Sequence, residues 1–248
     1  MPGAPSNITN WQPTIPVPQS IYEPNTTQQC PLGTRIVVGE RIFYYAQASA
    51  SVAAGTVVCA AAPTASHQSG IFTVAATSAG EIVVSGTSSA SVVANLYAEG
   101  YFGEALGTGA GELYKIRSHP AGTAAIPFTL YDRLNTALTS GAGFFLYPNP
   151  YKNCFVGSSA LGFAIGVAPT AVTSGAFYWL QTWGIANPVH SAASAAAVAL
   201  KLSTGGNVHA MYPAATDGPG VVGWAIGKNS QLAATAAENN PVFLAIRP

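Results

Sequence analysis

Charged side chains are scarce in this chain of 248 residues, where nine Lys and Arg and nine Asp and Glu make up 7 % of the sequence and cancel to zero net charge. Ordinary soluble domains carry about 25 % charged residues. A freely diffusing monomer also keeps a net charge, because uncharged surfaces associate. The deficit therefore predicts that other protein subunits cover much of the surface in a large assembly.

The scarcity also excludes several kinds of partner. The basic residues are spread along the chain, so no local patch neutralises phosphates and we expect no nucleic-acid partner. No stretch reaches the roughly 18 apolar residues of a membrane-spanning helix, so we expect no membrane partner. The first residues, MPGAPSNITNWQPTIPVPQ, lack a basic segment followed by an apolar one, and we expect no secretory signal.

Residues with catalytic or metal-binding chemistry are few and scattered. Three cysteines without a C-x-x-C pair predict small buried hydrophobes in a reducing compartment rather than disulfides or a zinc site. The stretch GTGAGE (107–112) lacks the spacing and the Lys-Ser/Thr of a phosphate loop, so we expect a β-loop. No G-x-S-x-G elbow supports a hydrolase. We expect no enzyme, no cofactor and no metal site. The cysteines and histidines are Cys30, Cys59, Cys154, His67, His119, His190 and His209.

Proline is abundant at the N-terminus, with seven prolines before residue 34. Proline favours extended polyproline conformations and cannot donate ladder hydrogen bonds. Residues 1–33 are therefore predicted to form an extended arm. Trp11, Ile15 and Tyr22 are unusual in a solvated tail, and we expect them to contact a neighbouring subunit. A solvated terminus is the alternative.

Short apolar runs rich in Val, Ile, Phe and Tyr follow, separated by Gly, Ser, Thr and Pro at spacings typical of a sandwich or barrel. We predict an all-β fold, a β-sandwich or β-barrel of many short strands with at most one or two short helices. The best helical candidate is 130–140, where Leu recurs every fourth residue. The expected domains are a β-rich domain at 34–160 and a small β-barrel at 161–248. The expected strands are 35–48, 55–61, 70–77, 81–86, 91–102, 112–119, 126–132, 143–149, 162–168, 176–184, 197–203, 221–227 and 241–248.

A similar turn sequence recurs three times, as SVAAGTVV (51–58), ATSAGEIVV (76–84) and AVTSGAFYW (171–179). Each places small residues before a glycine and then begins a strand. The glycine supplies a backbone conformation with positive φ, and the small residues keep the turn tight. The repetition predicts that similar β-corners are used more than once.

The segment VTSGAFYWLQTWG (172–184) concentrates aromatic side chains in one strand-length stretch. Phe177, Trp179 and Trp183 fall on one face by alternation, and Tyr178 falls on the other. Both faces are largely apolar, which is typical of a strand covered on both sides. We therefore predict core and interface roles for Phe177, Trp179 and Trp183. The alternative is a carbohydrate-binding β-sandwich that uses Trp179 and Trp183 as a platform.

Four C-terminal stretches together resemble the cement or decoration proteins of tailed bacteriophage heads: LGFAIGVAPTAVTSGAFYWLQTWGIA (161–186), VALKLSTGGNV (198–208), VVGWAIG (221–227) and PVFLAIRP (241–248). Residues 95–151 also resemble structural proteins from phage genomes. The resemblance covers about half the chain, rests on turn and strand texture, and contains no catalytic motif. Many decoration proteins are about half as long as this chain.

The resemblance implies a structural virion protein that binds the outer surface of a phage capsid and stabilises the shell by bridging capsomers. The implied partners are the major capsid protein and further copies of the chain itself, in a homo-oligomer such as a trimer. The implied location is the virion capsid, after synthesis in the host cytoplasm. Another shell or tail protein of the virion would show the same composition.

Overall fold

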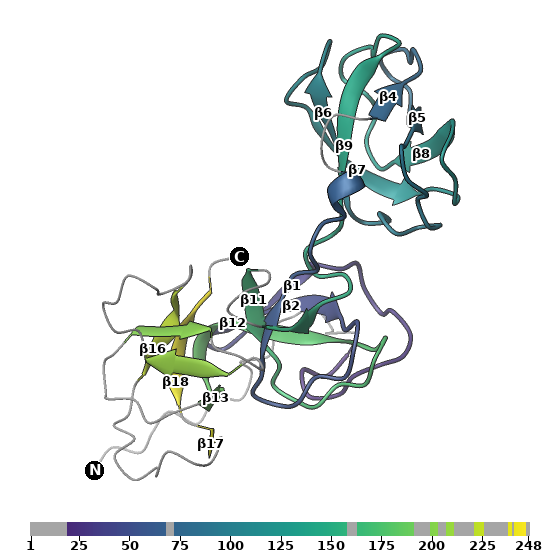
Figure 1. Cartoon of the computed structure of the whole chain (residues 1–248). Helices are drawn as coiled ribbons and strands as arrows, with labels where there is room; N and C mark the ends of the chain where they lie inside the picture. The colour runs from purple at the N-terminus through teal and green to yellow at the C-terminus, as the bar shows by residue number, and fades with distance from the viewer. Residues whose placement is uncertain are drawn as a thin grey trace, which may run out of the picture. The chain divides into compact units, whose positions relative to one another are not determined.

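The computed structural model is nearly all β, with 45 % of its residues in strands. The short 3-10 turn η1 (Ala65–His67) is the one helical element in the described part of the chain. The all-β expectation is therefore confirmed (Figure 1). The structure describes residues 19–67, 72–157, 163–190, 199–202, 207–210, 221–225, 238–239 and 241–246.

The chain divides into two compact units whose limits differ from the predicted domains 34–160 and 161–248. Unit 1 comprises residues 1–61 and 151–248, and unit 2 comprises residues 62–150. The reason is a long-range strand pairing: β2 (Arg41–Gln47) runs antiparallel to β12 (Phe177–Ala186), with Gln47 opposite Phe177. The two ends of the chain therefore share one sheet, and unit 2 is an insertion between them.

The described strands of unit 1 belong to one sheet. Its order is β10-β3-β11-β12-β18-β16-β14-β15-β13-β17, and β2 pairs with both β1 and β12. Val, Ile, Phe and Tyr dominate these strands, and their alternating burial places one face against a core. The remaining bounds are β1 (Arg35–Val38), β3 (Val57–Cys59), β10 (Phe155–Val156), β11 (Ala164–Val167), β13 (Val189–His190), β14 (Ala199–Leu202), β15 (Val208–Ala210), β16 (Val221–Ala225), β17 (Glu238–Asn239) and β18 (Val242–Ala245).

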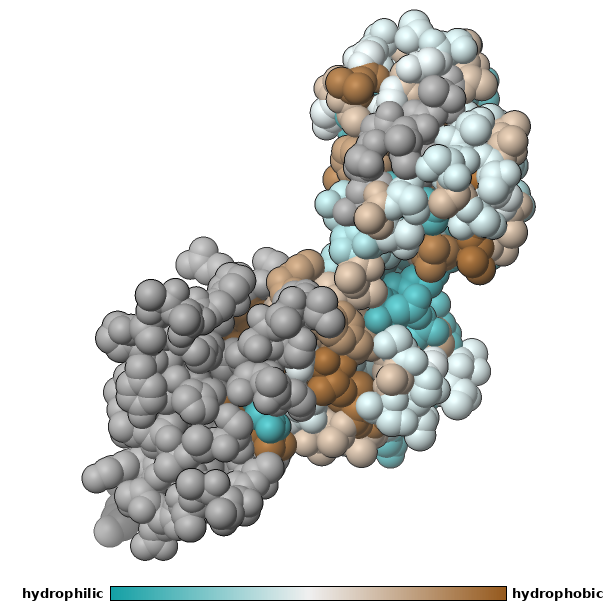
Figure 2. All heavy atoms as spheres, viewed as in Figure 1, coloured by the Kyte–Doolittle hydropathy of each residue, from teal (hydrophilic) through white to brown (hydrophobic). Residues whose placement is uncertain are grey.

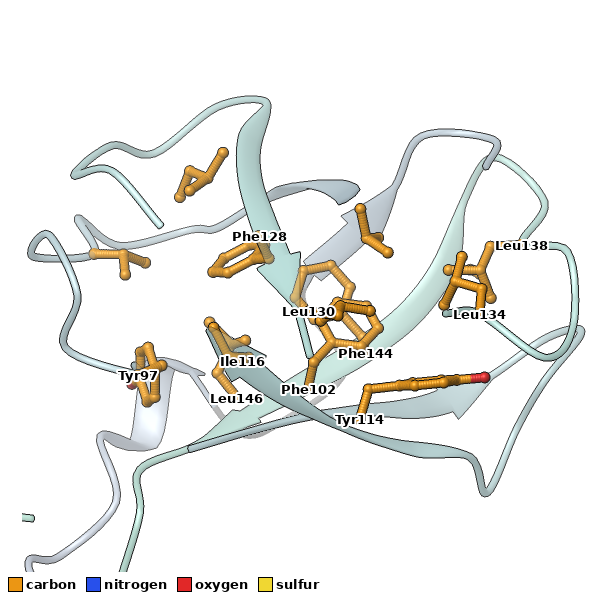
Figure 3. Close-up of a cluster of buried hydrophobic side chains, with 14 residues drawn as sticks. Tyr97, Phe102, Tyr114, Ile116, Phe128, Leu130, Leu134, Leu138, Phe144 and Leu146 are labelled. Carbon is orange, nitrogen blue, oxygen red and sulfur yellow. The ribbon is translucent and has the colours of Figure 1, made fainter. Parts of the chain in front are cut away.

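Unit 2 is a closed barrel with the order β4-β5-β8-β7-β6-β9. Its interior is filled by apolar side chains, with Tyr97 at one end of the cluster and Leu134 and Leu138 at the other (Figure 3). Phe102 and Phe144 stack near the centre, with ring centroids 4.4 Å apart. The strands are β4 (Phe72–Val74), β5 (Val83–Thr87), β6 (Tyr101–Leu106), β7 (Leu113–Ser118), β8 (Ile126–Leu130) and β9 (Ala142–Tyr147).

The predicted β-corners are confirmed, and the structure adds that they hold each other. Gly55 and Gly175 have φ of 76° and 78°. Val52 and Val172 exchange backbone hydrogen bonds of 2.9 and 2.8 Å, and Gly175 N donates to Ala48 O (2.9 Å). We call such a mutually bonded pair of turns a reciprocal corner. The third predicted corner, at Gly80 (φ 87°), has its own partner in unit 2.

The predicted helix at 130–140 is wrong. Leu134 and Leu138 lie in the barrel core, but their backbones complete the reciprocal corner opposite Gly80. Gly80 N donates to Leu134 O (2.8 Å), and Thr77 and Leu138 exchange backbone hydrogen bonds. These bonds to another segment replace the i to i−4 bonds of a helix. The four-residue leucine spacing thus marks two buried positions of an extended corner.

The predicted strand at 91–102 is correct only at its end, because β6 begins at Tyr101. Val92 exchanges backbone hydrogen bonds with Gly122 (2.8 and 3.0 Å), and Asn95 N donates to His119 O (3.0 Å). Asn95 has φ of 55°, a left-handed conformation that asparagine tolerates. This segment is therefore another corner, in which asparagine stands where glycine stands elsewhere.

The predicted arm packs on its own unit over its described part, residues 19–33. Trp179 Nε1 donates to Gln19 O (3.0 Å), and Gln19 Nε2 donates to Phe177 O (2.9 Å). Asn25 exchanges backbone hydrogen bonds with Phe177 (2.9 and 2.7 Å), and Leu32 is buried. This segment therefore extends the cover of β12 within its own unit, and contact of its exposed residues with a neighbouring subunit stays a prediction.

Candidate functional site

A row of large apolar side chains crosses three neighbouring strands of unit 1, β12, β18 and β16. Ile185 lies opposite Phe243, and Phe243 lies opposite Trp224. Directly opposed residues project from the same face of a sheet. Trp183 joins the row through an edge-on contact with Phe243, with ring centroids 5.2 Å apart. We call these four residues the aromatic strip.

The aromatic strip is open to solvent although its strands are anchored from the other face. Ile185 is 51 % exposed, Trp224 46 % and Trp183 37 %, whereas both neighbours of Phe243 in β18 are buried. On the face in view in Figure 2, most described residues have intermediate hydropathy and the apolar ones form separate areas. Contiguous exposed apolar surface marks a site of interaction on soluble proteins. The strip is therefore the candidate binding surface of unit 1.

The path of β12 explains why its two tryptophans differ. Its first half is covered by β2 and by residues 19–33, so Trp179 is fully buried, in line with the expectation of cover on both faces. The register with β2 shifts between Gln181 and Trp183, and Gly184 has φ of 86°. Such a bulge re-aims the side chains that follow it. Trp183 consequently emerges at the surface beside β18.

The structure does not bring the predicted site residues together. Trp179 packs against Tyr45, with ring centroids 4.9 Å apart, which confirms its predicted core role; its full burial leaves no surface for an interface or a sugar platform. Phe177 stacks on Tyr45 and is half-buried. Tyr22 is exposed and lines a pocket together with Ile185 of the strip. Of the predicted residues, Trp183 is the one that belongs to the strip itself. The remaining two predicted residues, Trp11 and Ile15, lie outside the described residues.

Sequence reasoning missed Ile185, Trp224 and Phe243. Their signal is the alternation in VVGWA (221–225) and VFLA (242–245), where one large side chain falls between smaller or buried neighbours. Alternation predicts that such a side chain projects away from the core. It does not say that three of them align, since that depends on which strands pair.

Two carboxylates lie at the end of the barrel of unit 2, beneath the loop that GTGAGE forms between β6 and β7. A Cβ at Gly109 would lie 3.5 Å from Glu112 Oε2 and 3.7 Å from Glu104 Cγ. Glu112 accepts hydrogen bonds from Asn135 Nδ2 (3.0 Å), from Thr136 Oγ1 (2.6 Å) and from the Tyr114 hydroxyl. These bonds hold the pKa of Glu112 at about 2. Glu112 is therefore a fixed anion.

Glu104 has the opposite surroundings. It is 2 % exposed, and neither carboxylate oxygen has a hydrogen-bond partner in the described structure. Burial, and secondarily the nearby charge of Glu112, raise the pKa of Glu104 to about 7. Two carboxylates with separated pKa values are typical of acid–base catalysis. A catalytic acid must reach its substrate, however, and Glu104 is closed off, so we interpret Glu104 as part of the barrel's interior and Glu112 as a partly exposed neighbour at its end.

His67 and His119 serve the core of the same barrel. The hydroxyl of Tyr97 lies 2.5 Å from His67 Nδ1, and Tyr97 N donates to His119 Nε2 (3.0 Å). Nδ1 of His119 then donates to Pro120 O (2.9 Å). Burial lowers the pKa of His67. No group of three or more His, Cys, Asp or Glu among the described residues could hold a metal ion.

Cys59 and Cys154 are buried thiols without a disulfide, in agreement with the expected role as small hydrophobes. Within the described segments, no helix is long and apolar enough to cross a membrane. No family model, no curated protein and no solved structure matches this chain. The aromatic strip, a row of exposed apolar side chains, is thus the feature of the described structure that indicates a function.

Proposed function

We propose that the chain is a structural virion protein that binds the outer surface of a phage capsid and stabilises the shell by bridging capsomers. The observation that carries the proposal is the aromatic strip, two tryptophans, a phenylalanine and an isoleucine side by side on three paired strands. Tryptophan is enriched among the residues that dominate binding energy at protein interfaces. A surface of this kind on a rigid sheet suits permanent burial against protein.

The composition supports the same role. Charged residues make up 7 % of the chain. Covering uncharged surface removes few ions from water, and desolvating an ion is the expensive part of burying a surface. A standard protein interface buries about 1,600 Å² in total. The chain can therefore form large contacts on more than one side, as a protein that bridges capsomers must.

Carbohydrate binding is the second candidate function. The structure changes which tryptophans could form the sugar-binding platform. Trp179 is fully buried and cannot stack on a sugar, whereas Trp183 and Trp224 are exposed in one row. Exposed aromatic faces of this kind favour stacking on apolar ligand surfaces. The two candidates share the strip and differ in what covers it.

The test begins with mass spectrometry of purified virions from a phage that encodes the protein, which should contain the chain. Heads that lack the protein are then mixed with purified full-length chain, and binding is measured by cosedimentation. Because a buried interface tryptophan contributes about 2 kcal/mol or more, Trp224→Ser should weaken binding about thirtyfold. Bound wild-type protein should also raise the temperature at which heads release DNA.

Leu113→Ser is the matched control, since Leu113 is an exposed apolar residue of unit 2 outside the strip. This variant should bind heads like the wild type. Absence from virions, or equal head binding by Trp224→Ser and wild type, contradicts the proposal. If the chain instead binds a glycan array and Trp224→Ser abolishes that signal, the carbohydrate candidate replaces it.

A further inference from the structure

A pocket of about 280 Å³ adjoins the aromatic strip in unit 1. Ile185 belongs to both, since it lines the pocket and lies in the strip. The other walls are mostly apolar, but a guanidinium and a phenol hydroxyl also face the space. The residues that matter here are Tyr22, Arg41, Val167, Gln181, Ile185 and Pro241.

Arg41 is the cation of this pocket and has no anion. Its Nη1 donates to the Tyr22 hydroxyl (3.1 Å), and its guanidinium carbon lies 5.4 Å from the centre of the Phe43 ring. No carboxylate in the described part of the chain forms an ion pair with it, and its side chain is partly exposed at the pocket. A guanidinium at the wall of a pocket presents N–H groups in a geometry that binds carboxylates. The N–H groups of Arg41 that do not bond Tyr22 are therefore available to an anion that enters the pocket.

The pocket wall is fixed in place by β12. A Cβ at Gly184 would lie 2.9 Å from Glu40 O and 3.2 Å from Arg41 Cα, so the glycine lets the backbone of β12 lie directly against Arg41. The Gln181 amide donates to Trp183 O (3.1 Å) and Ile185 O (2.8 Å). These contacts hold the base of Arg41 and the strip residues in one rigid frame, which favours binding.

We infer that this pocket receives the carboxylate of an Asp or Glu side chain from the protein partner that covers the aromatic strip. The inference rests on the proposed function. The guanidinium offers parallel N–H groups that match a carboxylate. The Tyr22 hydroxyl accepts from Arg41 and keeps its own hydrogen to donate to the same anion. Val167 and Pro241 provide apolar walls for the methylene stem. A single cation suits this monoanion better than a phosphate dianion.

The test uses full-length ¹⁵N-labelled protein and a glutamate blocked at both backbone ends as amides. Titration should shift the Arg41 Nε–H signal in the NMR spectrum, while the matched blocked glutamine should not. Arg41→Gln should weaken binding of the glutamate probe about tenfold, the contribution of a charge-assisted hydrogen bond. Equal responses to the two probes overturn the inference. Tighter binding of inorganic phosphate than of the glutamate probe also overturns it.

Head binding separates this inference from the proposed function. If both hold, Arg41→Gln and Trp224→Ser each weaken cosedimentation with heads. If Trp224→Ser weakens it and Arg41→Gln does not, the proposed function stands and the carboxylate site is wrong. If the chain binds the glutamate probe through Arg41 but does not bind heads, the proposed function fails and the pocket has a different carboxylate partner.

Discussion

Glu104 is the residue whose surroundings fit its chemistry least. An ionised carboxylate buried without hydrogen bonds is strongly disfavoured, so the proton stays on until the pH is well above the ordinary range for glutamate. Its cross-strand neighbour Glu112 cannot relieve this, because hydrogen bonds keep that side chain ionised. The barrel thus holds a neutral acid next to a fixed anion.

The folded barrel should therefore lose stability as the pH rises. The pKa of Glu104 is about 7 in the folded state, above its ordinary value of 4.5, so the folded state binds the extra proton between these values. The stabilisation is fully present below about pH 4.5 and is lost as the pH passes through 7, a change of about 3 kcal/mol. Urea unfolding at several pH values measures it through the methyl NMR signals of Ile116 and Ile126, both in the barrel core.

Glu104→Gln supplies the comparison, because an amide does not titrate. The variant should lack this part of the pH dependence, and above pH 8 it should be more stable than the wild type. The exposed carboxylate in Glu81→Gln is the matched control and should leave the wild-type profile unchanged. A wild-type profile that stays parallel to that of Glu104→Gln would contradict the burial argument.

Sequence reasoning at this scale identified the right strand but did not distinguish the buried Trp179 from the exposed Trp183. Alternation along β12 treats Trp179 and Trp183 as equivalent. The bulge between them and the left-handed Gly184 directly after Trp183 break that equivalence, and no local pattern specifies a bulge. The roles of Glu104 and Arg41 could not be predicted from the sequence either, because the surroundings of each side chain are set by segments that are distant in the sequence.

At the scale of elements, the reciprocal corner is the recurring device of both units. One turn donates and accepts backbone hydrogen bonds with a distant turn, and a left-handed residue closes each side. Glycine has no Cβ and adopts this conformation without strain, and asparagine tolerates it better than other side chains do. In the corner of unit 2 formed by Val92 and Gly122, Asn95 follows this order on one side, whereas Ala125 (φ 46°) closes the other side contrary to it.

Gly175→Ala tests the corner by strain alone, since no atom lies within 4 Å of the added Cβ. The left-handed backbone should cost about 1–2 kcal/mol of unfolding free energy for alanine. Gly175→Asn should cost clearly less, and it serves as the matched variant. Urea unfolding followed by tryptophan fluorescence measures both, because Trp179 is buried in unit 1. Equal losses for alanine and asparagine would contradict the strain argument.

The elements themselves were largely predictable. Most strands lie inside the apolar runs that suggested them, and the three glycine corners occur where the repeated turn sequence placed them. The helix at 130–140 and the strand at 91–100 failed for one reason: both segments bond to a distant corner, which local spacing does not reveal. Propensity identifies a strand, whereas its partner is decided by the whole fold.

At the scale of the whole molecule, one unit is inserted into the other. Unit 2 leaves unit 1 after β3 and returns before β10, and these two strands pair with Phe155 opposite Cys59. Paired antiparallel strands bring opposite Cα atoms to about 5 Å. The predicted boundary near residue 160 missed this arrangement because composition does not change where the insertion begins.

Each unit should fold without the other. Residues 62–150 have a closed barrel and a core of their own, and the two ends that they leave in unit 1 are close enough for a short Gly/Ser linker. We expect both proteins to give dispersed NMR spectra and cooperative thermal transitions. An unfolded spectrum from either one would contradict the division. Full-length protein with the linker inserted between residues 61 and 62 controls for the linker itself.

The pairing of β2 with β12 also fixes the order in which the chain can fold during synthesis. β2 leaves the ribosome early, but its partner strand follows the entire inserted barrel. Unit 2 contains all six strands of its barrel and can therefore fold first. Until β12 is synthesised, β2 and the segments before it form an incomplete sheet. Unpaired strand edges invite association with other chains. A chain truncated before β12 therefore contains a folded barrel joined to an N-terminal segment with unpaired strand edges. Such truncated chains should aggregate.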